Sequence, residues 1–597
     1  MTGEAVAAAL RAAGAHPGGG VVQLAPGSYR VAANATLVVG EGVTLRGAGM
    51  AATTLVFGKQ TAGLAAARRH LGLIHGDNTT GYWGLEDLAI VAPQTDHTSQ
   101  YTGSPVVSDC GGDGVFRDGN WQPPVDPADG LATNSWACSG MRVRRVKITI
   151  DKACAAGTAW PATTSYAASC GGYTAINASL HGADMFAGVV PAVSITGRHA
   201  VLEDCDITHY GTCGSNVAPL LSVNSARDVA VRWNTLRYGC AAYSLGSVTA
   251  MTFEHNTLVP YKNASGGGSN VDIFGRRMEM RRLFYANNSQ RLCPAAPGRY
   301  RPPVHLETMT LDGGAGFYEG SVTVARGGPV VVTDTPAGLQ PLGRSRPAWR
   351  FAAVLPLVGP GAGQWRRAEL QGTGNTTWRL DHGFEPGHGP VSGKTFVTIT
   401  KLEAQLLFVG NAWSCSHFQL YGSCYDCVVA ENAFDASFAA SWGRNPHRLL
   451  GGWQLNFQVE WLRNVVTTGT GITLMTSDQP TSSRRGNGGG LAAAAAINAS
   501  YKGSLNSRVV LRENIFDTGG GIKLGTASPD GAAQTNGNVL VDSNVLRATC
   551  NLTTGPMPAG ANVNRWLPCG RNCSLHDVVL RGNELDDVRS CADEPRN

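Results

Sequence analysis

The chain has 597 residues, more than one ordinary globular core holds, so we expect either several domains or one elongated, repetitive architecture. Glycine supplies 77 residues and charged residues only 15%, a composition that indicates frequent turns and few solvated helical faces. The net charge of +5, spread over this length without a dense basic run, argues against a nucleic-acid partner, and no run of about 18 apolar residues predicts a membrane span.

The first predicted element is a helix near the start of the chain. In AVAAALRAAGA, Val6 and Leu10 with the alanines between them form an apolar face, and HPGGG ends the helix. The segments VVQLAPGSYRV and NATLVVGEGVTLRGAG follow as the first predicted strands. We interpret the helix as a lid over the open strand edges of a repetitive β structure. These residues do not form a signal peptide, because Glu4 and Arg11 interrupt the apolar stretch.

One short pattern recurs: an apolar residue, two variable positions, an asparagine, one variable position and another apolar residue. The asparagines of these copies are Asn234, Asn256, Asn411, Asn432, Asn464, Asn514, Asn544 and Asn583. Two further copies carry Leu88 and Cys205 at the asparagine position. The flanks alternate as strands do, so each copy predicts a strand, a turn and another strand. Asparagine suits the turn because it tolerates left-handed backbone angles and can bond turn amides and its own stacked copies.

The spacing of the copies indicates how they stack. Asn234 and Asn256 are 22 residues apart and Asn411 and Asn432 are 21 apart, the length of one coil of a three-sided β-helix. Later intervals vary, which suits coils whose turns accept insertions. A leucine-rich repeat or a propeller is the alternative, although the former would keep a regular, leucine-dominated period. We predict an all-β right-handed parallel β-helix, a solenoid with an N-terminal capping helix, long loop insertions and a small inserted β module.

The start of the chain resembles the pectin-lyase-like superfamily of right-handed parallel β-helices. The similarity lies in the capping helix, then GGGVVQLAPGSYRV, then GVTLRGAG, followed by the asparagine-marked coils. The resemblance covers most of the chain apart from the insertions and implies the fold. It implies no particular activity, because that fold serves lyases, hydrolases, epimerases, tailspikes and noncatalytic surface proteins.

Changes in composition predict the organisation of the chain. Residues 1–300 are expected to hold the capping helix and N-terminal coils, interrupted by loop-like insertions at 94–140 and 152–188. The asparagine pattern disappears in 301–400, which we predict to be a small inserted β module, and it resumes in the C-terminal coils of 401–597. Within the module, GPGAGQWRRAEL resembles a Gly-Gln-aromatic-Arg element of some bacterial β-helix proteins of unassigned activity.

Cysteines and glycosylation sequons indicate an oxidising, secreted setting. The chain has 15 cysteines, and the candidate disulfide partners are Cys213, Cys240, Cys154 and Cys170. Asn-X-Ser/Thr sequons occur at Asn34, Asn78, Asn177, Asn263, Asn287, Asn375, Asn498, Asn551 and Asn572. We therefore expect an extracellular glycoprotein whose signal peptide lies outside the given sequence, with at least one cysteine left over as a buried thiol or as a link between chains.

The signatures of two well-defined enzyme classes are missing. Polygalacturonase-like hydrolysis needs an Asn-Thr-Asp element and clustered aspartates, whereas the chain offers GHG around His388 and a late pair at Asp586 and Asp587. A calcium-dependent pectate lyase needs a strand-borne aspartate trio, whereas the chain offers only RLDHGF in the inserted module. If the chain is an enzyme, a polysaccharide lyase is favoured over a glycoside hydrolase.

The best candidate cluster lies on two successive coils. Aligning Cys205 with Asn234 stacks Asp206 over Thr235, and the candidate catalytic residues are Asp206, His209, Arg237 and Tyr238. Arginine, histidine and tyrosine are the groups that neutralise a uronate carboxylate, remove its C5 proton and protonate the leaving oxygen. No cofactor is required, and calcium on Asp204 and Asp206 is an alternative use of these carboxylates. A solvated polar edge beside stacked tyrosines is the structural alternative.

A second candidate face is WSCSHFQLYGSCYDC, with His417, Tyr421 and Tyr425. Its three cysteines, Cys415, Cys424 and Cys427, favour structural bridging over a redox or zinc site, because neither a βαβ setting nor paired Cys-X-X-Cys and His spacing is present. The tryptophans in or near loops that could stack on sugar rings or pack the insertions are Trp121, Trp136, Trp160 and Trp442.

Two functions are consistent with these features. The first is a secreted, glycan-associated β-helix glycoprotein that binds a polysaccharide or acts on it as a lyase, with a groove over the coils near residues 200–260. The second is a noncatalytic structural subunit of an extracellular wall, adhesin or filament, which self-assembles through its loops. Polysaccharide or N-linked glycans are the expected partners in the first case, and copies of the chain itself in the second.

Overall fold

The structure is a computed structural model. It describes residues 2–33, 35–58, 72–76, 81–93, 106–108, 115–117, 120–122, 140–151, 192–209, 219–237, 241–259, 269–271, 279–291, 309–311, 316–324, 329–333, 351–371, 376–400, 402–414, 417–420, 424–435, 437–444, 455–467, 469–477, 504–517, 522–526, 535–547, 553–556 and 576–586. These residues fall into two compact units. Unit 1 comprises Met1–Val125, Thr133–Val271 and Leu283–Thr308, and unit 2 comprises Asp126–Ala132, Asp272–Arg282 and Met309–Asn597.

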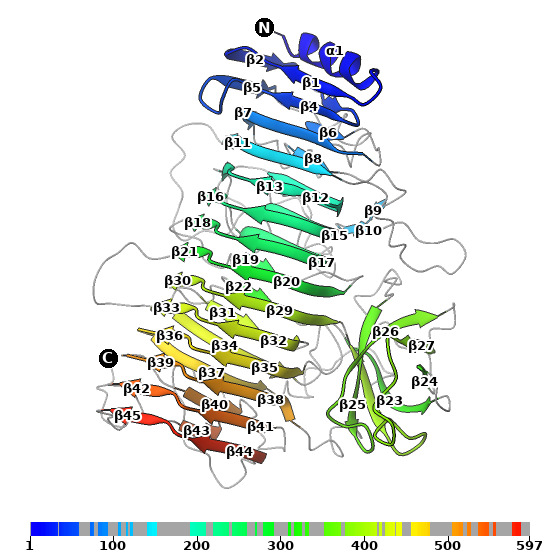
Figure 1. Cartoon of the computed structure of the whole chain (residues 1–597), viewed down its shortest axis with the longest axis vertical. Coiled ribbons are helices and arrows are strands. Elements are labelled where there is room, and N and C mark those ends of the chain that lie inside the picture. Colours follow the sequence, from blue (N-terminus) through cyan, green and yellow to red (C-terminus); the bar gives the residue numbers. More distant parts are fainter. Residues whose placement is uncertain are drawn as a thin grey trace, which may run out of the picture. The chain divides into compact units, whose positions relative to one another are not determined.

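Unit 1 consists of one helix and a stack of parallel strands (Figure 1). Its elements are α1 (Gly3–Gly14), β1 (Gly20–Gln23), β2 (Gly27–Val31), β3 (Leu37–Val39), β4 (Val43–Arg46), β5 (Thr53–Phe57), β6 (Ile74–Gly76), β7 (Trp83–Pro93), β8 (Val106–Ser108), β9 (Val115–Arg117), β10 (Asn120–Gln122), β11 (Met141–Asp151), β12 (Val193–Arg198), β13 (Val201–Glu203), β14 (Asp206–His209), β15 (Pro219–Arg232), β16 (Thr235–Arg237), β17 (Ala241–Glu254), β18 (Thr257–Val259), β19 (Ser269–Val271) and β21 (Ser289–Arg291). The residues of β20 (Met280–Ala286) are divided between the two units.

Unit 2 continues with coils of the same kind. Its coil strands are β22 (Met309–Leu311), β29 (Glu403–Val409), β30 (Ala412–Ser414), β31 (His417–Leu420), β32 (Cys424–Ala430), β33 (Ala433–Asp435), β34 (Ser437–Arg444), β35 (Asn456–Leu462), β36 (Val465–Val466), β37 (Gly469–Ser477), β38 (Ser504–Arg512), β39 (Ile515–Phe516), β40 (Ile522–Thr526), β41 (Thr535–Asp542), β42 (Val545–Arg547), β43 (Thr553–Pro556), β44 (His576–Arg581) and β45 (Glu584–Asp586).

Strand pairing confirms the predicted parallel β-helix. Each coil strand pairs in parallel with its counterpart in the next coil, as β15 does with β17 from Pro219 opposite Ala241 to Arg232 opposite Glu254. In unit 2, β32 pairs with β35 and β35 with β38 in the same manner. Inward-facing side chains such as Val231 and Phe253 are fully buried, so the stacked coils of unit 1 enclose an apolar core. The leucine-rich repeat and the propeller are therefore wrong.

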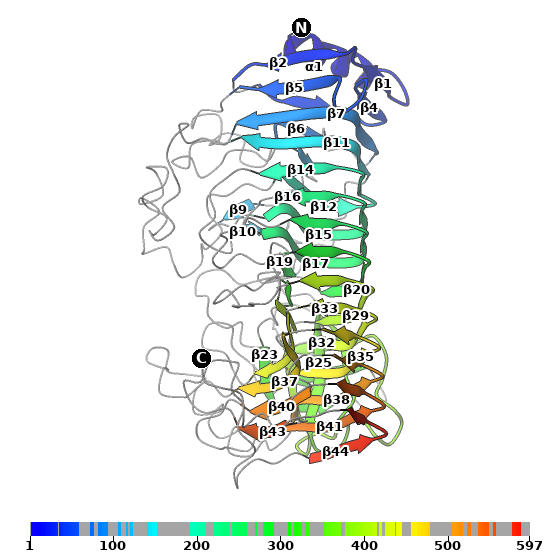
Figure 2. The same cartoon turned by 90° about the vertical axis from the view of Figure 1, so that its left-hand side faces the viewer.

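The predicted helix covers the first coils. α1 lies at the N-terminal end of the stack, next to β1, β2 and β4 (Figure 2). It packs against β1 to β4 and buries Val6 and Leu10, which are 2% and 1% exposed. Gly3 lies so close to the backbone of β2 that an added Cβ would stand 2.7 Å from Cα of Val31. The apolar face is narrower than predicted, because Ala8 and Ala9 are exposed and Gly3 takes part instead. The helix thus begins the solenoid by covering its first strand edges.

The recurring asparagines form buried ladders inside the turns. In unit 1, the Asn234 carboxamide donates to the Asn256 Oδ1 at 2.9 Å, and the Asn256 carboxamide donates to the Asn288 Oδ1 at 3.0 Å. In unit 2, the same contact links Asn411, Asn432, Asn464, Asn514, Asn544 and Asn583 in order. Each Oδ1 also accepts the backbone N–H of the ladder residue in the preceding coil. The ladder therefore satisfies buried turn amides that the strands leave unpaired.

Two features of these turns differ from the prediction. The left-handed residue is the one before each ladder asparagine, such as Trp233 with φ 56° or Arg463 with φ 50°, and not the asparagine itself. The asparagine is selected for its buried side-chain hydrogen bonds rather than for its backbone angles. Asn288 belongs to the ladder although the pattern omitted it, because Gln290 occupies the position that is otherwise apolar.

The predicted insertions require smaller corrections. Residues 94–140 are not one continuous loop, because β8 within them pairs in parallel with β6 and β12, and β9 pairs with β10 as a hairpin. Residues 152–188 lie outside the described part of the chain. Similarly, β22 lies inside the predicted module of 301–400 but pairs with the coil strand β31. The module's own fold begins later, at Gly316.

A six-stranded antiparallel barrel occupies the remainder of that predicted module. Its strands are β23 (Gly316–Val324), β24 (Val330–Thr333), β25 (Phe351–Val358), β26 (Arg366–Gln371), β27 (Thr377–Leu380) and β28 (Phe396–Thr400), closed in the order β23-β24-β27-β26-β25-β28. Its core contains Trp378, Val354 and Ile399, all almost fully buried. The division of the whole chain at residues 300 and 400 remains a prediction.

The GQWRR sequence fastens this barrel to the coils of unit 2. Trp365 packs on the buried ring of Tyr425, with ring centroids 5.4 Å apart. The Arg367 guanidinium forms a bidentate pair with the buried carboxylate of Glu279, one bond being 3.0 Å long. Arg366 and Gln364 bond each other and the barrel's loops. The contacts of this motif therefore attach the barrel to the coils of unit 2.

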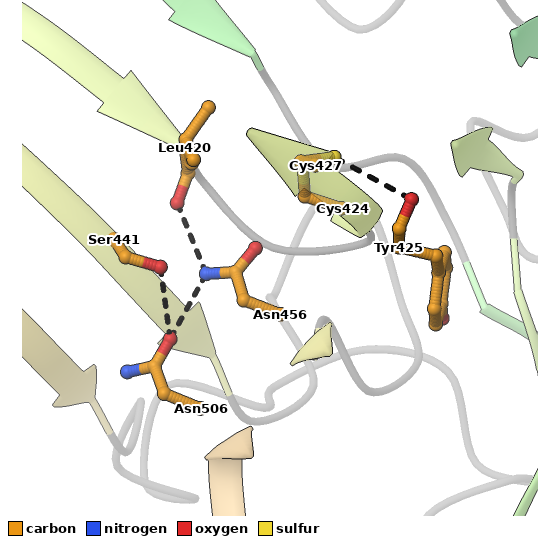
Figure 3. The surroundings of a disulfide bond; sticks show 7 residues. All are labelled: Leu420, Cys424, Tyr425, Cys427, Ser441, Asn456 and Asn506. Atoms are coloured by element: carbon orange, nitrogen blue, oxygen red, sulfur yellow. Dashed lines mark hydrogen bonds between the residues drawn. A yellow bond between two sulfur atoms is a disulfide. The ribbon is translucent and has the colours of Figure 1, made fainter. Parts of the chain in front are cut away.

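A second, shorter polar ladder lies in unit 2 near a disulfide (Figure 3). The Asn456 carboxamide donates to the Asn506 Oδ1 at 3.0 Å and to the carbonyl of Leu420 at 3.2 Å, and the Ser441 hydroxyl also donates to the Asn506 Oδ1. Cys424 and Cys427 are bonded to each other within β32. This pairing agrees with the structural bridging predicted for these cysteines.

One ion cluster predicts a pH dependence of the last coils. The Asp542 carboxylate accepts hydrogen bonds from Arg581 at 2.7 and 3.1 Å and from Arg512 at 3.1 Å, and the Arg581 bonds hold the pKa of Asp542 at about 2. Because this pKa lies below the unfolded value of about 3.9, the pair stabilises the coil above about pH 4, and that contribution disappears as the pH falls to about 2.

We expect hydrogen exchange of β41 and β44 to accelerate between about pH 4 and 2, after correction for intrinsic exchange. In Asp542→Asn, the protection should be lower at pH 7 and should change less over that interval. Asp517→Asn is the control, because Asp517 pairs only with an arginine on an exposed position. Equal pH profiles for the Asp542→Asn variant and the unmodified chain would contradict the assignment.

Candidate functional site

The candidate cluster of the sequence lies on β14 and β16, which stack in the predicted register. Asp206 is opposite Thr235 and Thr208 is opposite Arg237. The Arg237 Nε lies 3.3 Å from the Asp206 Oδ1, and both side chains are about one third exposed. An arginine and a carboxylate from adjacent coils therefore meet on the outer surface of unit 1.

The full set of four candidate catalytic residues remains a prediction. His209 ends β14, opposite Ile150, but its side chain lies outside the described part of the chain, as does all of Tyr238. Only Asp206 and Arg237 are therefore placed, and they bond to each other. That pairing fits the structural alternative at least as well as it fits a lyase, because a lyase needs the guanidinium for the substrate carboxylate.

Trp233, which the sequence pattern did not single out, lies at the turn directly before β16, in the same coil as Arg237. Its ring is 48% exposed, stacks near His255 with centroids 6.1 Å apart, and has the Arg232 guanidinium 4.7 Å from its centroid. Trp233 also has φ 56°, a left-handed conformation that costs a bulky L-residue about 1–2 kcal/mol. The signal in the sequence is the aromatic residue at the turn position, because most other copies carry a charged, small or amide side chain there, such as Asp204, Arg463 or Gly410.

We use the name Trp233 surface for a set of outward-facing residues on three successive coils, the coil of Trp233 and its two neighbours. It consists of Asp206, Arg232, Trp233, Thr235, Arg237, His255 and Thr257. Thr235 lies between Trp233 and Arg237 along the strand, and Thr257 stacks on Thr235 from the next coil. The surface thus combines an aromatic ring, hydroxyls and paired charges.

The corresponding positions in unit 2 are different. The residues that stack in register there, at the position of Thr235, are Ala412, Ala433, Val465, Ile515, Val545 and Glu584. The first five side chains cannot form hydrogen bonds, none of the six is a threonine, and no tryptophan occupies the preceding turn in those coils. The polar and aromatic character of the Trp233 surface is therefore a property of unit 1 and is not required by the coil itself.

Charge alternates from coil to coil in unit 1. Counted from four residues before to three after each ladder position, successive coils carry Arg46; Glu86 and Asp87; Arg142, Arg144, Arg145 and Lys147; Glu203, Asp204 and Asp206; Arg232 and Arg237; Glu254; and Arg291. Each coil has one sign, and each neighbour has the other. Ion pairs follow between coils, such as Arg145 with Asp87 at 2.6 Å and both Arg144 and Arg232 with Glu203. Hydrogen bonding to Arg145 lowers the pKa of Asp87.

This alternation stabilises one order of stacking. Opposite charges in register on adjacent strands attract, whereas like charges repel, so a slip by one coil would place similar signs together. The sequence alone contains this regularity, but it becomes visible only after each coil is aligned on its ladder residue. The prediction of the site from the sequence did not depend on this alternation of charge.

Metal binding by this surface remains a prediction. Within the described ranges, no group of three or more histidine, cysteine, aspartate or glutamate side chains is placed to hold an ion. Asp204 occupies the left-handed turn position and Asp206 lies two residues further on, where its carboxylate bonds Arg237. Calcium on these two carboxylates would compete with that arginine.

Only some of the predicted cysteine and sequon residues lie in the described part of the chain. Cys213, Cys240, Cys154 and Cys170 lie outside the described residues. Among the described cysteines, Cys205 is a buried free thiol at a ladder position, and burial raises its pKa to about 12. Of the sequons, Asn287 is described and is exposed at a turn, beside the buried Asn288. The other eight sequons are not among the described residues.

The second candidate face is wrong at Tyr425. This side chain is fully buried between the barrel and the coils, and its hydroxyl lies 2.8 Å from that of Thr400. Burial raises the pKa of Tyr425, so its phenol stays protonated. The His417 side chain and Tyr421 lie outside the described residues. The side chains of Trp121 and Trp442, and all of Trp136 and Trp160, lie outside them too.

Fold and site together define a parallel β-helix protein with a polar, tryptophan-bearing surface in unit 1. No family model and no curated protein matches the chain. No helix in the described residues is long and apolar enough to span a membrane.

Several solved structures are similar to the chain. One is the mannuronan C-5 epimerase AlgE4 A-module of Azotobacter vinelandii, with 11% identity, 98% of this chain and 92% of that chain covered, and a TM-score of 0.33. Another is a PL6 alginate lyase in complex with a trisaccharide, with 9% identity, coverage of 99% and 84%, and a TM-score of 0.38. A third is the catalytic unit of a GH87 alpha-1,3-glucanase from Streptomyces thermodiastaticus strain HF3-3, with 11% identity, coverage of 100% and 68%, and a TM-score of 0.30. The assignment of the fold depends on the strand pairing described above.

Proposed function

We propose that the chain is an extracellular glycan-binding β-helix protein whose binding site is the Trp233 surface. The observation that carries the proposal is Trp233 itself, a half-exposed ring held in a left-handed conformation that asparagine or glycine would adopt at lower cost. An exposed aromatic ring and hydroxyl groups are what a sugar requires, since its C–H face packs on the ring while its hydroxyls form hydrogen bonds. Thr235 and Thr257 supply such hydroxyls on adjacent coils.

Secretion and glycosylation are part of this proposal. The Cys424–Cys427 disulfide, the nine sequons and the exposure of Asn287 support an oxidising compartment and a glycoprotein. Asn287 is two coils from Trp233, at the equivalent turn position, so its glycan would border the Trp233 surface without disturbing the buried ladder.

The proposal predicts that Trp233→Gly weakens glycan binding and leaves the fold intact; glycine is chosen because asparagine at this position would create an Asn-X-Thr sequon with Thr235. Native electrophoresis through gels that contain single neutral or acidic polysaccharides would measure retardation of each variant. We expect retardation by at least one polysaccharide, and a loss of affinity of about tenfold or more in Trp233→Gly. The melting temperature should not fall, because glycine adopts a left-handed turn without strain.

Arg463→Gly is the matched control, because Arg463 holds the same turn position in unit 2 and is also about half exposed. It should bind like the unmodified chain. If no polysaccharide retards the protein, or if both variants bind equally, the Trp233 surface is not a glycan site.

Lyase action is a separate outcome. Absorbance at 235 nm on uronate polymers would reveal the unsaturated product of a lyase. The noncatalytic structural role is the second candidate, favoured by the ion pair that already engages Arg237 with Asp206. Absence of both product and binding, with assembly of the purified chain into oligomers or filaments, would favour that second role.

A further inference from the structure

We propose that the Trp233 surface takes an uncharged glycan and not a polyuronate. This inference rests on the proposed function and adds the substrate class. It follows from how the charged side chains of unit 1 are already engaged and from the chemistry that remains beside Trp233.

The guanidinium groups that could bind a substrate carboxylate hold protein carboxylates instead. Arg237 forms an ion pair with Asp206, with 3.3 Å between Nε and Oδ1, and Arg232 forms one with Glu203, with 2.8 Å between Nε and Oε2. Arg232 also covers the Trp233 ring. A polyuronate would have to displace Asp206 or Glu203 from these arginines, and it would then face a carboxylate left without its partner.

The alternation of sign also cancels the field that would attract a polyanion. Within the eight-residue window around each ladder position, the seven charged coils of unit 1 carry eight basic and six acidic residues in alternating rows. Neighbouring coils are about 4.8 Å apart, which is less than the Debye length of about 8 Å at physiological salt. An anionic polymer would therefore meet acidic rows as closely as basic ones, and long-range attraction would be small.

The remaining contacts are uncharged. The Trp233 ring offers an apolar face, and the hydroxyls of Thr235 and Thr257 can donate or accept hydrogen bonds. His255 adds a second exposed ring, whose centroid lies 6.1 Å from that of Trp233. The rings and hydroxyls fit the C–H faces and hydroxyl groups of neutral sugars.

The test measures binding to hydroxyethyl cellulose and galactomannan against polygalacturonate and alginate, at 20 and 200 mM NaCl. We expect binding to at least one neutral polymer with less than about twofold change between the two salt concentrations, and weaker binding to both acidic polymers. Stronger binding to an acidic polymer that falls steeply with salt would overturn the inference while leaving the glycan site in place. Binding to none of the four would overturn the inference and the proposed function together.

A second variant tests the cause directly. Asp206→Ala removes the carboxylate from Arg237 without creating a sequon, so affinity for polygalacturonate should rise by about tenfold at 20 mM NaCl and fall again at 200 mM. Asp517→Ala is the matched control, because it frees Arg547 from an equally long 3.3 Å pair and changes the net charge equally. An equal rise in both variants would show a general charge effect, and no rise in Asp206→Ala would show that the pairing does not exclude polyuronates; either result contradicts the inference.

Discussion

Leu10→Asp is expected to open the N-terminal end of the solenoid and to cause aggregation. Leu10 is 1% exposed on the buried face of α1, so the substitution places a carboxylate in the apolar space between this helix and the first coil. Loss of the leucine contacts and burial of an unpaired charge destabilise by on the order of 3–5 kcal/mol. Since coils are stabilised by their neighbours, detachment of α1 would expose the edges of β1 to β4 as templates for other chains.

Hydrogen exchange and light scattering measure the two consequences. Protection of residues 20–57 should fall sharply in Leu10→Asp while protection of unit 2 persists, and scattering should increase with protein concentration. Ala9→Asp is the matched control, because it adds the same charge to the adjacent, exposed position of the same helix. A monomeric Leu10→Asp protein with unchanged protection of the first coils would show that α1 is not a lid.

Asn464→Ala is expected to disrupt the middle of the unit 2 ladder. The Asn464 side chain donates to the carbonyl of Val429 and to the Asn514 Oδ1, both at 2.9 Å, and accepts the backbone N–H and carboxamide of Asn432, both at 3.0 Å. Alanine leaves these buried groups without partners. At about 1–3 kcal/mol for each unsatisfied buried group, with some relaxation, the loss in unfolding free energy should be on the order of 3–5 kcal/mol.

Chemical denaturation should show this loss, and exchange of β32, β35 and β38 should locate it. Arg463→Ala is the control in the same turn, since its ion pair with Glu431 is about half exposed and should contribute little to stability. Similar stabilities for the Asn464 and Arg463 variants would mean that water replaces the ladder's hydrogen bonds and that the asparagines contribute little.

The local pattern was sufficient to predict the coils but not every member of the ladder. Period-two alternation and a repeated asparagine report strand and turn directly, because both depend on neighbouring residues. Asn288 escaped detection because ladder membership requires a carboxamide at the stacked position and not an apolar residue two positions later. The left-handed residue was misplaced by one for a related reason, since the sequence shows that a turn exists but not which backbone bends.

The site was less predictable than the fold because it depends on which side chains of adjacent coils come into contact. Alignment of Cys205 with Asn234 gave the correct register for Asp206 and Arg237, but nothing local indicated that they would bond each other. Tyr425 was wrongly placed on an open face because the barrel that covers it is attached through residues some 60 positions earlier, at Trp365.

By itself, the sequence determined that this chain is a capped parallel β-helix, because apolar alternation, turn asparagines and the opening helix are local features repeated many times. Only the tertiary structure decided which charges neutralise one another and which ring stays exposed, because these properties arise between coils that are 20 to 60 residues apart in the chain. For the same reason, the exposed Trp233 emerged as the candidate contact for a glycan only once the coils were stacked.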